Sequence, residues 1–177
     1  MALAYPNRYW IAMSNLGFQT VFRLFSEVPR FAAERVFIPE DDGAPIRTFE
    51  NDQAVSDVEL LAISVSFETD YPSVLRLIES AGVNLAERIN TATGSSQEAY
   101  SRPLIIGGGA ALTLNPEPLA PFFDAIVIGE GEAIVEQISA VYLAARDRGA
   151  EFDELLLDLS QIEGVYVPSF YSVEYNS

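Results

Sequence analysis

The sequence of 177 residues contains no cysteine, no histidine and no lysine, so that all ten of its basic residues are arginines. Without cysteine the chain has no disulfide, no thiolate nucleophile and no cysteine ligand for zinc or an iron–sulfur cluster. Without histidine it lacks the commonest general base and metal ligand, and without lysine it cannot form a Schiff base. Ser-His-Asp, Cys-His and Schiff-base enzymes are therefore excluded, and we predict no catalytic residue and no metal ligand in this chain.

Positive charge is scarce compared with negative charge. The chain has 26 acidic and 10 basic residues, which gives a net charge of −16. A field of that sign repels phosphate backbones, so we expect no nucleic-acid partner. The acidic surface has two remaining explanations, which are solubility alone or a docking face for a basic partner or neighbouring domain.

Long apolar runs are absent as well. No run approaches the roughly 20 residues that cross a bilayer, and the N-terminus has no basic region followed by an apolar one. We therefore expect no membrane partner and a cytoplasmic location. Apolar residues make up 49% of the chain and aromatic residues 11%, so residues 1–177 form a single globular domain with a substantial core.

Short apolar runs alternate along the chain with segments of helical spacing. We predict strands at residues 2–5, 35–38, 60–66, 104–106 and 125–128, and helices at 14–27, 71–81, 132–148 and 152–159, with Ser14 as the cap of the first. Residues 91–97 are predicted to be a flexible surface loop, and residues 164–168 a terminal extended segment. The alternation indicates an α/β fold, a doubly wound five-stranded parallel sheet in the flavodoxin-like order 2-1-3-4-5.

Glycine-rich loops follow the last two predicted strands, at residues 107–109 and 129–132. The carboxyl ends of parallel strands meet at one edge of the sheet, where open α/β sheets bind ligands. Each loop also has a structural explanation: three glycines permit a tight turn, and Gly-Glu-Gly-Glu places acids at the start of a helix. The second loop is a poor phosphate cradle because its two glutamates would face the phosphate charge.

Several short motifs occur in a characteristic order: Pro6, Ser-Asn-Leu-Gly at 14–17, Ser-Val-Ser-Phe at 64–67, three glycines at 107–109, Asn-Pro-Glu-Pro at 115–118 and Gly-Glu-Gly-Glu at 129–132. In this order the chain resembles the N-terminal cobalamin-binding-type, Rossmann-like domains of radical SAM proteins, over nearly its whole length. The resemblance implies a cofactor-binding site formed by Ser14, Asn15, Gly17, Ser64, Ser66, Phe67, Gly107, Gly108, Gly109, Gly129, Glu130 and Gly131.

The same resemblance implies a partner and further cofactors. In that family a radical SAM barrel follows in the same chain and holds a 4Fe-4S cluster and S-adenosylmethionine. None of its cysteines is present here, so we interpret the chain as a fragment that is inactive alone and expect the iron–sulfur oxidoreductase or transferase chemistry in the barrel downstream.

One departure from the family concerns the ligand. Many cobalamin domains carry Asp-x-His-x-x-Gly after the first strand, with histidine below the cobalt, whereas Ala12 and Ser14 occupy those positions here. Two functions therefore stay open: binding and presenting a corrinoid without a histidine ligand, or serving as a cofactor-less docking or substrate-capping module. A flavin or a nucleotide is a third alternative as ligand.

Overall fold

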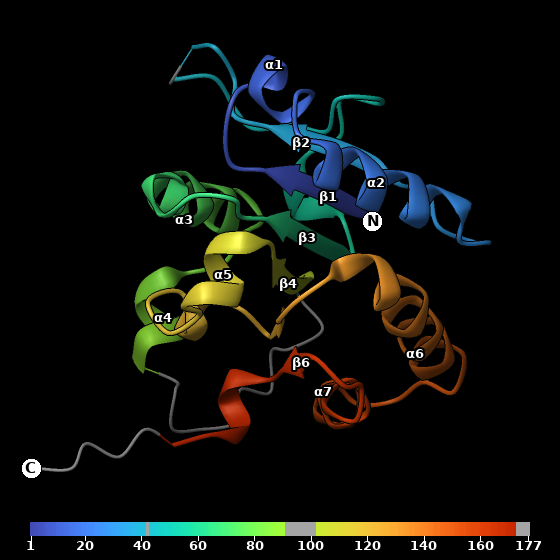
Figure 1. The fold of residues 1–177 in the computed structure, drawn as a ribbon. Coiled ribbons are helices and arrows are strands. Elements are labelled where there is room, and N and C mark those ends of the chain that lie inside the picture. The colour runs from blue at the N-terminus through green and yellow to red at the C-terminus, as the bar shows by residue number, and fades with distance from the viewer. Residues whose placement is uncertain (42, 91–101, 173–177) are drawn as a thin grey trace, which may run out of the picture.

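One mostly parallel sheet runs through the middle of the molecule, with helices on both of its faces (Figure 1). The computed structural model describes residues 1–41, 43–90 and 102–172. Their strands follow the spatial order β2-β1-β3-β4-β5-β6. The strand bounds are Ala2–Tyr5 for β1, Glu34–Phe37 for β2, Leu60–Ser64 for β3, Leu104–Gly108 for β4, Ala125–Val127 for β5 and Val165–Tyr166 for β6.

The predicted order of the first five strands is confirmed, and all four of their pairings are parallel. The prediction of five strands is wrong, because the short extended segment near the C-terminus adds a sixth. This strand, β6, pairs antiparallel with β5, and Tyr166 lies opposite Ile126. Gly164 precedes it with a φ of 87°, which lets the chain turn back along β5. A strand of two residues is too short to show an alternating pattern in the sequence.

Helices fill the connections between the strands. Their bounds are Tyr9–Ala12 for α1, Leu16–Glu27 for α2, Tyr71–Ser80 for α3, Leu85–Asn90 for α4, Ala110–Leu114 for α5, Val135–Asp147 for α6 and Phe152–Ser160 for α7. The four predicted helices are confirmed, with ends that shift by up to a few residues. Helices α1 and α5 were not predicted, because they are only about one turn long and show no helical period. No helix in the described part of the chain is both long and apolar enough to cross a bilayer.

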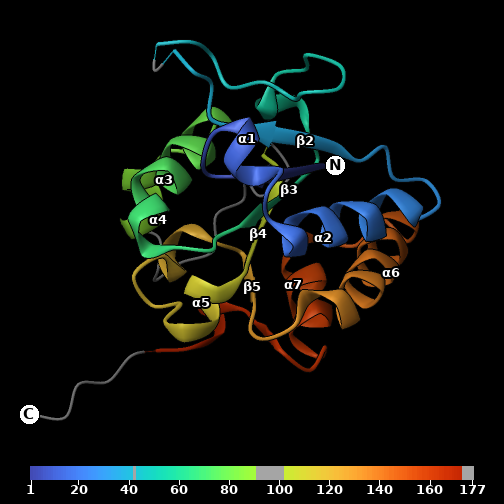
Figure 2. The ribbon, with the colours of Figure 1, turned by 45° about the horizontal axis from the view of Figure 1, so that its top comes forward.

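Alternate residues of each central strand pack against opposite helix layers. Leu60 and Ala62 belong to the core beneath α2, α6 and α7, whereas Leu61 and Ile63 belong to the core beneath α3 and α5. Figure 2 shows the two groups of helices on either side of the sheet. Burial on both faces explains why the strands are continuous apolar runs.

The start of α2 differs from the prediction. Asn15, not Ser14, is the N-cap, and its side-chain Oδ1 accepts a hydrogen bond of 2.9 Å from the backbone N of Phe18. The Ser14 hydroxyl instead donates to the carbonyl of Trp10, because α1 ends just before it. Both residues are good caps, so the sequence alone did not separate them. Residues 91–97, predicted as a surface loop, lie outside the described residues.

Candidate functional site

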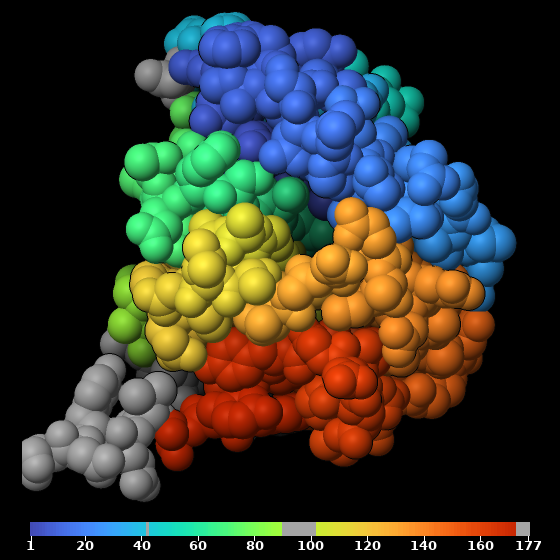
Figure 3. Space-filling model, viewed as in Figure 1, coloured from blue at the N-terminus to red at the C-terminus, as the bar shows by residue number. Residues whose placement is uncertain are grey.

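A pocket of about 660 Å³ opens at the carboxyl edge of the sheet. Figure 3 shows the hollow between α2 in blue, α5 in yellow and the start of α6 in orange. The pocket extends inward between α2 and α6, and its inner walls are apolar: Leu3, Phe18, Val21, Phe25, Ala62, Ile63, Ile106, Val127, Val135 and Ile138. Its volume falls within the range of small-molecule sites, about 300–1,000 Å³.

Ten of the twelve residues that the sequence implied for a cofactor site line this pocket: Asn15, Gly17, Ser64, Ser66, Gly107, Gly108, Gly109, Gly129, Glu130 and Gly131. The parallel strands explain the convergence, because each of these residues lies at or after the carboxyl end of a strand. Ser14 and Phe67 are not among the lining residues. Ser14 is held by α1, and the ring of Phe67 is exposed next to Ser66.

Asn15 joins the first loop of the pocket to the loop after β3. While its Oδ1 caps α2, its Nδ2 donates a hydrogen bond of 3.1 Å to the Ser66 hydroxyl. The nearby Ser64 hydroxyl forms no hydrogen bond among the described residues and is only half-buried. Asn15 and Ser66 are therefore held in place by each other, and Ser64 offers a donor and an acceptor to a ligand.

The three glycines after β4 have different roles. A Cβ on Gly107 would lie 2.7 Å from Leu112 Cδ1, and a Cβ on Gly109 would lie 2.5 Å from the Val65 carbonyl oxygen. Gly109 also has a φ of 111°. Internal packing therefore accounts for these two glycines. Gly108 differs, because a Cβ there would meet only Val127, at 3.6 Å, and would project toward the pocket.

The glycine loop after β5 forms the opposite side of the mouth. Gly129 has a φ of 103°, and a Cβ there would meet nothing within 4 Å. Its backbone N donates a hydrogen bond of 3.1 Å to the hydroxyl of Thr113 at the end of α5. This bond connects the glycine loop after β5 to helix α5, which follows the glycine loop after β4. Gly131 comes close to α2, where its Cβ position would lie 3.7 Å from Val21 Cγ2.

The charge at the mouth is negative. Of the described residues that line the pocket, the charged ones are Glu130 and Glu132, and both are exposed. A ligand that carries a free phosphate or carboxylate would meet these two carboxylates without a basic partner. The site therefore favours a ligand that is apolar and that is neutral or cationic overall.

Some of the residues that line the pocket could not be identified from the sequence. Thr113 and Leu114 line the mouth, but they lie on the short helix α5, which had no periodic signal. The apolar side chains of α2 and α6 that line the pocket also belong to the hydrophobic core, so helical spacing alone does not mark them as site residues. Three aromatic residues at or just after the end of β1 do not line the pocket: Tyr5 packs edge-on against Phe18, Tyr9 stacks on Phe49, and Trp10 is exposed.

Fold and site together define a doubly wound, Rossmann-like α/β domain with a ligand-sized pocket at its carboxyl edge. A family model described as "Radical SAM proteins, N-terminal" matches residues 17–168, which is most of the chain. The chain therefore belongs to this family of N-terminal regions of radical SAM proteins, and the radical SAM part of the predicted resemblance is confirmed. Comparisons with curated proteins and with solved structures gave no significant match.

Proposed function

We propose that this domain binds a corrinoid in the carboxyl-edge pocket and presents it to the catalytic domain of a radical SAM enzyme. The observation that carries the proposal is the pocket itself, which continues from the glycine-rich mouth into an apolar slot between α2 and α6. A glycine-rich surface admits a flat macrocycle close to the backbone. An apolar slot suits the aromatic base on the nucleotide arm of a cobalamin.

The residues of the mouth fit such a group. Of the three glycines after β4, Gly108 is the one whose missing side chain leaves space in the pocket rather than space for internal packing. Ser64, opposite Gly108 in the neighbouring strand, contributes a hydroxyl without another partner in the described structure. Gly129 and Thr113 form a hydrogen-bonded wall beside them. These four residues would hold and orient the cofactor.

The charge of the ligand distinguishes a corrinoid from the alternative ligands. A nucleotide or a flavin phosphate would bring two negative charges toward Glu130 and Glu132. In a cobalamin the cationic cobalt–corrin centre offsets the single phosphate charge of the nucleotide arm. The acidic mouth therefore favours the corrinoid over free nucleotides and flavin phosphates.

When bound, a corrinoid supplies a redox-active cobalt centre. The residues of this chain would position the macrocycle and exclude water from the slot, and they contain no histidine that could supply an imidazole to cobalt. The chain also lacks cysteine and lysine. We therefore propose that catalysis, the 4Fe-4S cluster and S-adenosylmethionine belong to a downstream radical SAM domain of the same cytoplasmic protein.

A second candidate function is a cofactor-less docking or substrate-capping module. It is favoured by large apolar side chains that are exposed at or next to the carboxyl edge. Leu16 at the start of α2 is 78% exposed, and Leu114 at the end of α5 is 84% exposed. Trp10 and Phe67 are exposed on neighbouring loops. Exposed apolar groups of this kind mark interaction surfaces.

Titration of the chain with hydroxocobalamin, followed by absorbance, distinguishes the two functions. We expect saturable binding, with a spectrum that does not shift toward that of a histidine-ligated cobalamin. An absence of binding would reject the corrinoid proposal and support the docking module. In that case Leu16→Glu and Leu114→Glu in the full-length enzyme should loosen the contact between its domains, as measured by limited proteolysis.

A further inference from the structure

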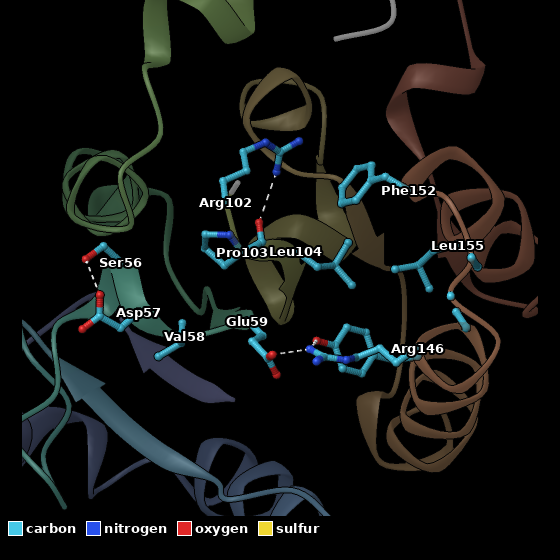
Figure 4. A pocket seen from close by; sticks show the side chains of 14 residues that line it. Ser56, Asp57, Val58, Glu59, Arg102, Pro103, Leu104, Arg146, Phe152 and Leu155 are labelled. Atoms are coloured by element: carbon cyan, nitrogen blue, oxygen red, sulfur yellow. Dashed lines mark hydrogen bonds and ion pairs between the residues drawn. The ribbon is translucent and has the colours of Figure 1, made fainter. Parts of the chain in front are cut away.

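A second pocket, of about 490 Å³, lies at the amino edge of the sheet, opposite the carboxyl-edge mouth (Figure 4). It is formed where β3 and β4 begin, and it is closed on the other side by the end of α6 and the start of α7. Its apolar lining consists of Val58, Pro103, Leu104, Ala145, Ala150, Phe152 and Leu155, together with the ring of Tyr142. Open α/β sheets bind their principal ligands at the carboxyl edge, so this pocket is a separate site.

Among the described residues, two arginines line this pocket, and they differ in how many of their hydrogen-bond donors are used. Arg102 donates two hydrogen bonds, of 2.8 and 2.9 Å, to the buried carboxylate of Asp124. Its guanidinium also lies over the ring of Phe152, 5.0 Å from the centroid. Arg102 is therefore a structural residue that closes one wall.

Arg146 has unused donors. Its Nη1 pairs with the Glu59 carboxylate and donates a hydrogen bond of 3.3 Å to the Tyr142 hydroxyl. Its Nε and Nη2 form no further hydrogen bond among the described residues. Figure 4 shows Arg146 and Glu59 side by side at the pocket wall. The side chains of the pair are 46% and 64% exposed, and exposed ion pairs of this kind are weak.

We propose that this pocket binds a small aryl carboxylate. The carboxylate accepts hydrogen bonds from the fork of Arg146 and displaces Glu59, whose side chain is free to move into solvent. The aromatic ring occupies the apolar space beside Leu104 and Leu155. A planar guanidinium pairs with a carboxylate through two parallel hydrogen bonds, and an apolar cavity with one charged group is the usual composition of a small-molecule site.

Charge makes the site selective for the anion. Of the described residues that line the pocket, Asp57 and Glu59 carry carboxylates. Asp57 accepts a hydrogen bond from the Ser56 hydroxyl, whereas Glu59 forms an ion pair with Arg146. A neutral amide can accept a hydrogen bond from Arg146, but it brings no charge to replace that of Glu59, and a cationic ring compound is repelled by the guanidinium. Binding should therefore be strongest for the anion.

Phenylacetate tests the proposal, with the neutral phenylacetamide and the cationic phenethylamine as comparators. The 177-residue chain is titrated with each compound and followed by methyl NMR. We expect saturable shifts of Val58, Leu104 and Leu155 with phenylacetate, and binding at least roughly tenfold weaker with both comparators. Shifts confined to Val135 and Ile138 at the carboxyl-edge pocket, or equal binding of all three compounds, would overturn the assignment.

Substitutions on both sides of the ion pair give opposite expectations. Arg146→Gln should weaken phenylacetate binding by roughly tenfold or more, because the charged donor is lost. Glu59→Gln should tighten binding about two- to fivefold, because the competing carboxylate is removed. Arg148→Gln is the matched control: Arg148 lies on the same helix end and pairs with Asp158 outside the pocket, so binding should not change. An unchanged affinity in both Arg146→Gln and Glu59→Gln contradicts the proposal.

Discussion

Ser64 and Gly108 lie opposite each other in the register of the parallel strands β3 and β4. Paired positions of neighbouring parallel strands face the same side, so a hydroxyl and a missing side chain share the mouth of the carboxyl-edge pocket. The two strand ends are locked together directly beyond this pair, because the backbone N of Val65 donates a hydrogen bond of 2.7 Å to the Gly108 carbonyl. This part of the site is therefore built on two hydrogen-bonded strand ends of the sheet.

The first prediction concerns Gly108 and the corrinoid. Gly108→Val should abolish binding of hydroxocobalamin, because the branched side chain would project into the pocket. The fold should survive, since the Cβ meets only Val127 at an ordinary contact distance and valine suits a strand. Gly108→Ala should weaken binding to an intermediate extent. Absorbance titration measures the affinity, and far-UV circular dichroism checks the fold; a folded Gly108→Val variant that binds like the wild type argues against this site.

The second prediction separates Gly109 from its neighbour. Gly109→Ala should lower the free energy of unfolding by roughly 2 kcal/mol or more, because the Cβ would collide with the Val65 carbonyl and the positive φ is strained for alanine. Gly108→Ala should change it by less than about 1 kcal/mol, since the position is open. Urea unfolding of the two variants provides the comparison. Equal stability of the two would show that Gly109 is not held in the conformation described here.

The sequence was sufficient to predict the order of the five parallel strands and four of the helices. Residues 60–63 and 104–106 are apolar at every position, so both faces of these strands are hydrophobic. This pattern is typical of a strand that is covered by helices on both sides of the sheet. The sixth strand could not be predicted, because Val165–Tyr166 is too short to show a period. Its pairing depends on the tertiary position of β5, to which it returns through Gly164.

Only the part of the candidate site that lies at the strand ends could be predicted from the sequence. Glycines 107–109 and 129 mark turns in the sequence, but the sequence does not say which of them face a ligand. That distinction depends on what lies above each Cβ position, namely Leu112 at Gly107, the Val65 carbonyl at Gly109 and open space at Gly129. The role of Thr113 could not be predicted for a similar reason, since it arises from one hydrogen bond between helix α5 and the loop after β5.

The third prediction concerns the cap of α2. Asn15→Ala should reduce the free energy of unfolding by about 1 kcal/mol, because the Phe18 amide loses its acceptor and Ser66 loses its donor. Ser14→Ala, one residue earlier, is the matched control and should be nearly neutral, since Ser14 bonds only to an exposed carbonyl in α1. Thermal melts of the two variants give the comparison. A larger loss at Ser14 than at Asn15 would show that the helix begins earlier than described.

A buried charge cluster at the start of β4 gives the protein an acid-sensitive element. Asp124 forms ion pairs of 2.9 Å with Arg88 and 2.8 Å with Arg102, and it accepts a hydrogen bond from the backbone N of Ile105. Burial alone would raise the pKa of the Asp124 carboxyl, but the two arginines and the amide outweigh burial and lower it. Asp124 thereby joins α4, β4 and the start of β5.

The fourth prediction follows from this cluster. Because the pKa of Asp124 is lower in the folded than in the unfolded chain, its contribution to stability is fully present above the unfolded pKa of about 3.9 and is lost as the pH falls through the folded value. Asp124→Asn should therefore lose about 3–5 kcal/mol at pH 7, since two partly buried arginines lose their counter-charge, and its stability should fall less steeply in acid. Asp147→Asn serves as the control: this exposed carboxylate pairs with Arg30 at the surface, so its removal should change stability only slightly. Urea unfolding of the wild type and of both variants between pH 3 and pH 7 measures these differences in stability. Equal losses in the two variants at pH 7 would mean that the buried cluster contributes no more than a surface ion pair.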